Sequence, residues 1–335
     1  MAIPIEVPTG AIRYNTDSNK MECFDGTKWM QVAVSSPDLG VLSGGSWIPA
    51  GARGVWTAGH SGTNVIDYIT ISTKGNSLDF GDTSLRKYNS GGSSNTRGVW
   101  GGGDPAGNVD TIEYITISIT GNAIDFGNLT TGTTYVAGCS NQTRLIIGGG
   151  KTPSFVNTIQ YLTIASTGDA KDFGDLTLAR SNIGAVANPT RGVFAGGYTP
   201  THQNIIDYVT IASTGDAKDF GDITTSIGTN STQCGSTTRG IVWGGYPAGT
   251  NIDYFTFATR GNAVHFGDTS NTIKYRNCTS DTVRGVAGGG QDGPGDANTI
   301  EYITIQTEGN AVDFGDLLSN KHNSCAAFSN GHGGL

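Results

Sequence analysis

One unit of about 47 residues recurs six times along this chain, and this repeat limits the possible folds more than any other feature. Three positions are kept in every copy. They are a phenylalanine at Phe80, Phe126, Phe173, Phe220, Phe266 and Phe314, a preceding tyrosine at Tyr68, Tyr114, Tyr161, Tyr208, Tyr254 and Tyr302, and an earlier arginine at Arg53, Arg97, Arg144, Arg191, Arg239 and Arg284. Because repeats of this length bury their apolar faces only against one another, the copies must pack together.

Each copy is predicted to contain four β-strands. The run at 112–117 and its equivalents are rich in β-branched and aromatic residues and contain no proline. Side chains at 112 and 114 share one face of this strand and those at 115 and 117 the other, so both faces are apolar. A glycine followed by Asn or Asp, as in Gly121-Asn122, separates the third and fourth strands and is typical of a two-residue type II′ hairpin loop. The unit is therefore a four-stranded antiparallel meander.

A four-stranded unit of 40–50 residues is typical of a β-propeller blade. The expected fold is all-β: a six-bladed β-propeller with four-stranded blades and a small N-terminal β module. The first copy has no repeat-like strand before Arg53, whereas residues 322–330 have the pattern of a first strand with nothing after it. We therefore expect the C-terminal strand to complete the first blade and close the ring, which leaves no open sheet edge.

The repeat resembles the kelch type of propeller repeat. In both, the second strand ends in a glycine pair, a variable loop follows, the third strand carries a tyrosine, and the fourth carries an aromatic residue with an arginine nearby. The resemblance covers residues 50–330. It implies a kelch-like propeller.

Residues 10–32 have a different pattern, with short strands predicted at 11–14, 20–24 and 28–32. This segment resembles small β modules near the N-termini of bacteriophage tail-fibre and appendage proteins. The matching residues are Gly10, Ile12, Tyr14, Asn15, Thr16, Phe24, Gly26, Thr27 and Trp29. The resemblance implies a virion protein in which residues 1–36 form an attachment module, 37–49 a linker and 50–335 the propeller.

The composition excludes several classes of protein. The net charge is −8 and only 14% of residues are charged, which argues against nucleic-acid binding. No apolar run is long enough for a membrane span, and the N-terminus lacks the pattern of a signal peptide. The cysteines are widely spaced and are predicted to be free thiols; they are Cys23, Cys139, Cys234, Cys278 and Cys325.

The six repeated arginines are interpreted as structural, together with the six repeated phenylalanines. Acidic residues recur before the tyrosine and after the phenylalanine in most copies, so we expect an Arg–carboxylate or Arg–carbonyl tie between strands or blades. An anion site is the alternative. The acids lack the spacing of a calcium loop, and no two histidines have metal-ligand spacing, so neither a metal nor another cofactor is expected. No catalytic motif is present, and the chain is predicted not to be an enzyme; a pair of acids that cleaves a glycan is the alternative.

One set of loops varies between the copies while the rest of the unit is nearly constant. These are the links between the second and third strands and between the fourth strand and the next copy. A constant scaffold with one varied loop face is typical of a binding protein, although drift in an inert spacer gives the same pattern. The candidate ligand-binding residues are Phe155, Tyr198, His202, Tyr246, Asp104 and Asp292. The varied loops also carry Asn and Thr, and this mixture of hydroxyl, amide and ring groups suits a hydroxyl-rich glycan.

The sequence thus predicts a phage virion structural protein, a tail-fibre or appendage component. It would be assembled in the host cytoplasm and present the propeller for host-surface recognition or particle decoration. Its expected partners are other virion proteins, through residues 1–36, and a host-surface glycan; a homo-oligomer is compatible with the sequence. A bacterial cell-surface or secreted carbohydrate-binding lectin is the alternative.

Overall fold

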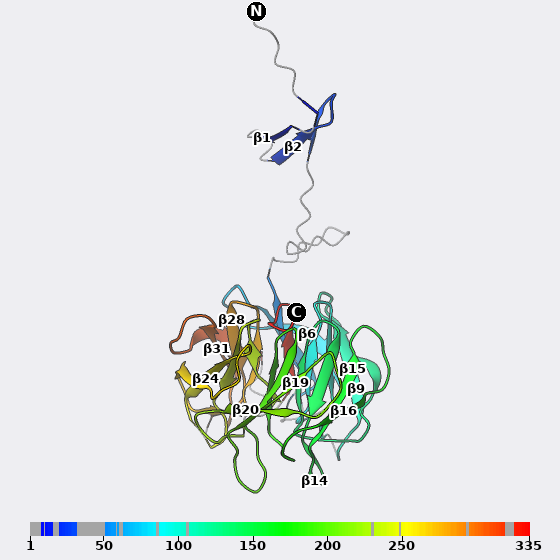
Figure 1. Ribbon diagram of the computed structural model, residues 1–335. Helices are drawn as coiled ribbons and strands as arrows, with labels where there is room; N and C mark the ends of the chain where they lie inside the picture. Colours follow the sequence, from blue (N-terminus) through cyan, green and yellow to red (C-terminus); the bar gives the residue numbers. More distant parts are fainter. Residues whose placement is uncertain are drawn as a thin grey trace, which may run out of the picture. The chain divides into compact units, whose positions relative to one another are not determined.

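The structure is a computed structural model of the 335-residue chain (Figure 1). It describes residues 8–9, 11–15, 20–31, 51–57, 59, 63–84, 87–104, 107–228, 231–247, 249–292, 295–318 and 325–335. The chain divides into two compact units, Met1–Ala50 and Gly51–Leu335. The expected linker at 37–49 lies outside the described residues, as do Gly10 and Thr16.

The first unit contains one antiparallel sheet of three strands, β1 (Ile12–Asn15), β2 (Lys20–Phe24) and β3 (Trp29–Gln31). Each strand lies within one residue of its predicted bounds. The ring centroids of Phe24 and Trp29 are 5.4 Å apart, and the Arg13 guanidinium lies 4.2 Å from the centre of the Trp29 ring. Arg13 also pairs with Glu22. These contacts hold the three strands together on one face of the sheet.

The described part of the second unit is built from antiparallel sheets, five of four strands and one of five, together with two smaller sheets. The first sheet contains β33 (Ala327–Ser329), β4 (Arg53–Trp56), β5 (Val65–Thr70) and β6 (Leu78–Asp82), and the second β7 (Ser90–Ser93), β8 (Arg97–Gly101), β9 (Thr111–Thr116) and β10 (Ile124–Asn128). The third contains β11 (Ala137–Ser140), β12 (Arg144–Gly148), β15 (Thr158–Thr163) and β16 (Lys171–Asp175).

The fourth sheet contains β17 (Gly184–Ala187), β18 (Arg191–Ala195), β19 (Ile205–Thr210) and β20 (Lys218–Asp222), with β21 (Ser231–Thr232) parallel to β17. The fifth contains β22 (Cys234–Gly235), β23 (Arg239–Trp243), β24 (Asn251–Thr256) and β25 (Val264–Asp268), and the sixth β27 (Asn277–Ser280), β28 (Arg284–Gly288), β31 (Thr299–Thr304) and β32 (Val312–Asp316). Short pairs between them are β13 (Lys151–Thr152) with β14 (Ser154–Phe155), and β26 (Ile273–Lys274) with β29 (Gln291–Asp292) and β30 (Gly295–Asp296). None of the described residues belongs to a helix that could cross a membrane.

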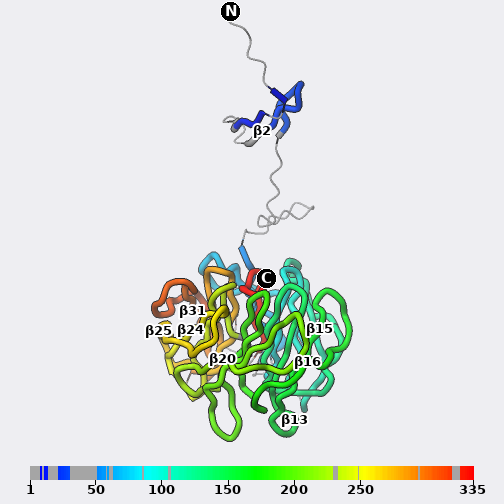
Figure 2. Tube along the Cα trace, in the orientation of Figure 1, coloured from blue at the N-terminus to red at the C-terminus, as the bar shows by residue number. Residues whose placement is uncertain are grey.

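The C-terminal strand completes the first sheet, as predicted. Strand β33 pairs antiparallel with β4, with Phe328 opposite Val55. Figure 2 shows the red C-terminal segment running beside the blue residues that begin this unit. The ends of the unit are thus joined by backbone hydrogen bonds across more than 250 residues of sequence.

The first strands of the six sheets contact one another in a closed order. Strand β7 contacts β11, β11 contacts β17, β17 contacts β22, β22 contacts β27, β27 contacts β33, and β33 contacts β7. They enclose a small cavity of about 40 Å³, which residues from all six line. This all-β arrangement of four-stranded sheets is compatible with a propeller-like fold.

The core lies between neighbouring sheets. One cluster joins Ile112 and Phe126 of the second sheet to Leu145 and Leu162 of the third, and each of these side chains is buried. Burial of each such side chain contributes about 1.5–3 kcal/mol. The third strands therefore need apolar residues on both faces, which explains the pattern read in the sequence.

The expected two-residue hairpin between the third and fourth strands is wrong. In the second sheet, β9 ends at Thr116 and β10 begins at Ile124, so seven residues separate them. The glycine and asparagine instead bind the preceding sheet. The amide of Gly121 donates to the carbonyl of Phe80 at 2.7 Å, and the side-chain oxygen of Asn122 accepts from the amide of Asp82 at 3.0 Å.

This junction recurs between every pair of neighbouring sheets. The amide of the residue two positions after each phenylalanine donates to the Asn or Asp side chain of the next copy. The pairs are Asp82–Asn122, Asn128–Asp169, Asp175–Asp216, Asp222–Asn262, Asp268–Asn310 and Asp316–Asn76. The last pair joins the sixth copy to the first, so the series of junctions is closed.

Glycine is required on the phenylalanine side of the junction because the two backbones approach closely. Gly174 has φ +144°, and a Cβ added there would lie 2.6 Å from the carbonyl oxygen of Gly215. The substitution Gly174→Ala therefore combines an unfavourable dihedral with a clash against backbone. We expect a loss of about 2–4 kcal/mol in the free energy of unfolding, measured by urea denaturation. The control is Gly295→Ala, which meets no atom within 4 Å; equal, small effects of both changes would contradict the account.

Deletion of residues 320–335 removes β33 and leaves the edge of β4 unpaired. We expect this truncation to aggregate or to fail to fold, because an open edge recruits strands from other chains. Deletion of residues 1–50, which belong to the other unit, is the matched control and should keep the melting temperature of the second unit. An unchanged melting temperature after the C-terminal deletion would contradict the closing role of β33.

His332 caps the cavity between the six first strands in its neutral form. Its Nε2 donates to the carbonyl of Ser93 at 2.9 Å, and its Nδ1 accepts from the amide of Gly334 at 3.1 Å. Burial lowers the pKa of His332 to about 4. The unfolded chain then binds more protons between pH 4 and about 6.5, so stability falls as the pH is lowered through this window.

The expected slope is at most about 1.4 kcal/mol per pH unit, because a single proton is involved. The substitution His332→Asn removes this titration while an amide can still donate to Ser93. The melting temperatures of the two proteins should therefore converge, or change order, between pH 7.5 and 4.5. A difference that stays constant over this range would show that His332 does not titrate as described.

Candidate aromatic binding site

Several of the varied loops bring aromatic side chains together at one end of the sheets. Tyr198 and His202 lie between β18 and β19, and Tyr246 lies between β23 and β24. These three candidates line a pocket of about 550 Å³ together with Asn182 and Tyr275. The sequence predicted the first three of these residues for a binding surface, and the fold places them in a single concave site.

Backbone bonds between different connections fix these loops. Tyr198 donates its amide to the carbonyl of Ser181 at 2.7 Å and accepts from the Ser181 amide at 2.9 Å. Tyr246 and Gly228 make the equivalent pair of bonds at 2.9 and 2.8 Å. Each loop that follows a second strand is therefore bound to the connection that precedes its own sheet. The ring positions are set by the backbone and not by side-chain packing alone.

The rings form a continuous series, which we call the aromatic arc: Phe155, Tyr198, His202, Tyr246 and Tyr275. Successive ring centroids are 5.8, 5.1, 5.3 and 6.1 Å apart along this series. Tyr246 is 41% exposed, so part of the arc faces solvent. An arc of rings of this kind presents flat apolar faces and hydroxyl groups side by side.

The pocket itself is close to neutral. Among its described lining residues there is no Asp, Glu, Lys or Arg. Burial lowers the pKa of His202, which keeps the imidazole uncharged at neutral pH. Two cations lie beside rings of the arc, with the Lys274 amine 5.1 Å from the centre of the Tyr246 ring and the Lys151 amine 5.8 Å from that of Phe155. The lining suits a ligand that stacks on rings and exchanges hydrogen bonds without charge.

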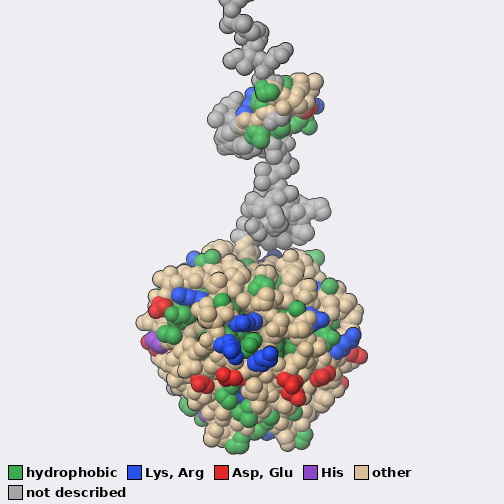
Figure 3. All heavy atoms as spheres, viewed as in Figure 1, with side chains coloured by type: hydrophobic (Ala, Val, Ile, Leu, Met, Phe, Trp, Pro, Cys, Tyr) green, Lys and Arg blue, Asp and Glu red, His purple; other side chains and the backbone are tan. Residues whose placement is uncertain are grey.

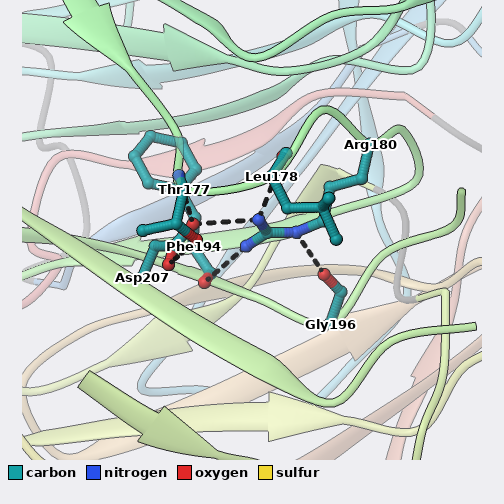
Figure 4. Close-up of polar contacts among 6 residues, drawn as sticks. All are labelled: Thr177, Leu178, Arg180, Phe194, Gly196 and Asp207. Carbon is teal, nitrogen blue, oxygen red and sulfur yellow. Dashed lines mark hydrogen bonds and ion pairs between the residues drawn. The ribbon is translucent and has the colours of Figure 1, made fainter. Parts of the chain in front are cut away.

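A buried ion pair anchors the connection that leads to Asn182 (Figure 4). Arg180, next to Ser181 and Asn182, donates to the Asp207 carboxylate at 2.9 Å and to the Gly196 carbonyl at 2.8 Å, and neither charged side chain is exposed. The same carboxylate accepts from the hydroxyl of Thr177 at 2.7 Å. These bonds hold the connection that carries Asn182 against the fourth sheet. Removing one partner would leave a buried charge unpaired, at a cost of about 3–5 kcal/mol.

The two acidic candidates lie outside the pocket lining. Asp104 follows β8, and its carboxylate accepts from the amide of Gly107 at 2.6 Å. Asp292 lies in β29, opposite Ile273. The described lining of the pocket contains no pair of carboxylates of the kind that cleaves glycosides.

The repeated arginines lie at the other end of the second strands and contact backbone carbonyls of a neighbouring sheet. Arg144 lies 4.8 Å from the centre of the Tyr161 ring, which meets Phe173 edge-on at 5.9 Å. Its guanidinium donates to the carbonyls of Ile211 and Ala212, both at 2.9 Å. All six copies repeat the Arg–Tyr–Phe stack, which involves Arg53, Arg97, Arg144, Arg191, Arg239 and Arg284 with Phe80, Phe126, Phe173, Phe220, Phe266 and Phe314.

The acids or glutamine before the tyrosine have a different role from pairing with these arginines. They accept hydrogen bonds from the residues that follow the fourth strand of the preceding sheet, as Asp253 does from the amide of Thr224 at 2.9 Å and Gln160 from that of Thr130 at 2.7 Å. They therefore tie neighbouring sheets together on the side of the varied loops.

The sequence did not single out Asn182 and Tyr275 of this site, nor Tyr88 and Tyr135, which stand at the equivalent positions before the second and third sheets. Each lies two residues before the start of a first strand and has positive φ, at 59°, 56°, 54° and 59°. The signal was the return of tyrosine at this position in three copies. It was read as part of a strand, because Tyr135 stands in the strand-like run Tyr-Val-Ala-Gly.

No group of three His, Cys, Asp or Glu side chains is placed to hold a metal ion in the described part of the chain. Four of the five free cysteines are buried, and burial raises the pKa of the Cys139 and Cys234 thiols to about 12. Much of the surface drawn in Figure 3 is neutral and polar, with charged groups in small clusters.

Neither a known protein-family model nor a curated protein matches the chain.

Proposed function

We propose that this chain is a structural component of a bacteriophage virion, such as a tail fibre or appendage. It presents a six-bladed, kelch-like β-propeller that binds a neutral host-surface glycan at the aromatic arc. The observation that carries the binding role is the neutral, ring-lined pocket on the varied loops. A nearly constant scaffold that holds varied loops in fixed positions is the usual plan of a recognition protein.

Three observations support the six-bladed ring. The first strands follow a closed order of contacts, and one junction recurs at six positions, including the one that joins the last copy to the first. The Arg–Tyr–Phe stack also occurs once in each copy. Six equal units that bury their faces only against one another are most simply arranged around an axis.

The virion role rests on the first unit. Residues 10–32 resemble the β modules of phage appendages, and residues 1–36 would attach the chain to other virion proteins, with 37–49 as a linker. A particle-decoration protein would use the same attachment without needing the pocket. A bacterial surface or secreted lectin would need the pocket without the attachment.

The binding role predicts that removal of one ring of the pocket weakens glycan binding. We expect Tyr246→Ala to weaken binding of the labelled full chain to a panel of immobilised neutral glycans by about tenfold, or 1.4 kcal/mol. Val283→Ala, at an exposed apolar residue outside the pocket, is the matched control. Unchanged binding by the Tyr246 variant would reject the pocket and leave a spacer or decoration role.

The virion role is tested separately, by the location of the chain. Mass spectrometry of purified particles should detect it in a fixed number of copies. Its absence from particles, together with its presence on a bacterial surface, would favour the lectin.

A further inference from the structure

A second group of rings lies where the six first strands open toward the varied loops. Tyr88 and Tyr135 lie two residues before β7 and β11, and their rings stack with centroids 4.1 Å apart and planes at 26°. The amide of Tyr135 donates to the carbonyl of Tyr88 at 3.0 Å, and that of Asn182 to the carbonyl of Tyr135 at 3.2 Å. These bonds connect neighbouring sheets at the opening and fix the two rings relative to each other.

The backbone at these positions is strained. A bulky residue with φ near +60° is a conformational outlier, and such strained residues collect at functional sites. Here the strain is repeated at equivalent positions, with tyrosine in three of the four. Glycine would relieve it, so the rings themselves are the feature that the strained backbone presents.

Tyr275 connects this pair to the aromatic arc. Its ring stacks on Tyr246 with planes at 24°, at the end of the arc. Burial raises the pKa of Tyr275, and the nearby hydroxyls of Tyr246 and Tyr88 raise it further. Burial likewise raises the pKa of Tyr135, with added contributions from Tyr88, Asp104 and Tyr275. Asn182, which lines the pocket, donates its amide to the carbonyl of Tyr135 at 3.2 Å, so the Tyr88–Tyr135 pair and the arc together make up one candidate binding surface.

We propose that this surface binds a linear oligosaccharide of several neutral sugar units, which runs from Phe155 along the arc to the Tyr88–Tyr135 pair. The inference rests on the proposed glycan-binding function and names its ligand as an internal stretch of a chain, not a single terminal sugar. The rings of the arc follow one another at centroid separations of 5.1 to 6.1 Å, and four of the five line the pocket of about 550 Å³, so a chain of sugar units could meet several rings in succession. The described pocket lining is uncharged and favours a neutral chain, although the Lys274 and Lys151 amines lie 5.1 and 5.8 Å from the centres of the Tyr246 and Phe155 rings.

The test compares short and long ligands. The probes are neutral linear glycans of one to six units, immobilised as an array and then, for those that bind, titrated by calorimetry against the full chain. We expect affinity to rise by tenfold or more from one unit to about four and then to level off. A monosaccharide that binds as tightly as its hexamer would overturn the extended site while leaving glycan recognition intact. Failure of every neutral glycan to bind would overturn both proposals.

The variants Tyr88→Asn and Tyr135→Asn remove one ring each without requiring a new backbone, because Asn182 has the same conformation at the equivalent position and asparagine tolerates positive φ. We expect each to weaken hexamer binding by about tenfold and to leave dimer binding unchanged, with melting temperatures close to that of the unaltered protein. Tyr246→Ala should weaken both ligands. Equal losses for dimer and hexamer in the Tyr135 variant, or no loss for either, would contradict the proposed path of the chain. Binding of an unfolded peptide in preference to all glycans would also contradict it.

Discussion

The junction between the phenylalanine turn of one copy and the Gly-Asn or Gly-Asp pair of the next is the interaction on which the rest of the structure depends. Each junction contains three hydrogen bonds. Between the third and fourth sheets, the amide of Gly215 donates to the carbonyl of Phe173, the amide of Asp175 to the side chain of Asp216, and the amide of Ala217 to the carbonyl of Asp175. Each contributes about 1 kcal/mol, but the geometric effect is larger because the backbones touch. The same spacing is imposed six times, so the angle between neighbouring sheets is fixed by main-chain contact. The apolar cores then fill a gap of constant width.

Much of this could be predicted from the sequence because strand patterns are local. The alternation of apolar residues in 112–117 gave the third strand, and the unpaired pattern near residue 327 gave the closing strand. The role of Gly121-Asn122 could not be predicted locally. Positive φ suits both a hairpin turn and an approach to another backbone, and the partner, Phe80, lies about forty residues away. Choosing between these roles requires the arrangement of the sheets.

The site was predicted in part for similar reasons. Loop variation pointed to Tyr198, His202 and Tyr246, and the fold brings them into one pocket. The same criterion selected Asp104 and Asp292, which lie outside the pocket lining. It missed Tyr135, because a residue next to a strand reads as part of it unless its dihedral angles are known.

The constant junctions and the varied loops divide the unit into two parts, since main-chain contacts hold the sheets and leave the loop side chains free to differ. Such a division is what allows one scaffold to carry many surfaces.

The closed series of junctions is tested most directly by native-state hydrogen exchange of the glycine amides. The amide of Gly75 bonds to Phe314 and so joins the last copy to the first, whereas that of Gly168 bonds to Phe126 within the series. In a closed ring both amides exchange only when the whole unit unfolds, and their free energies of exchange should be equal. Rapid exchange at Gly75 with slow exchange at Gly168 would mean that the sheets form an open stack, which would contradict the account.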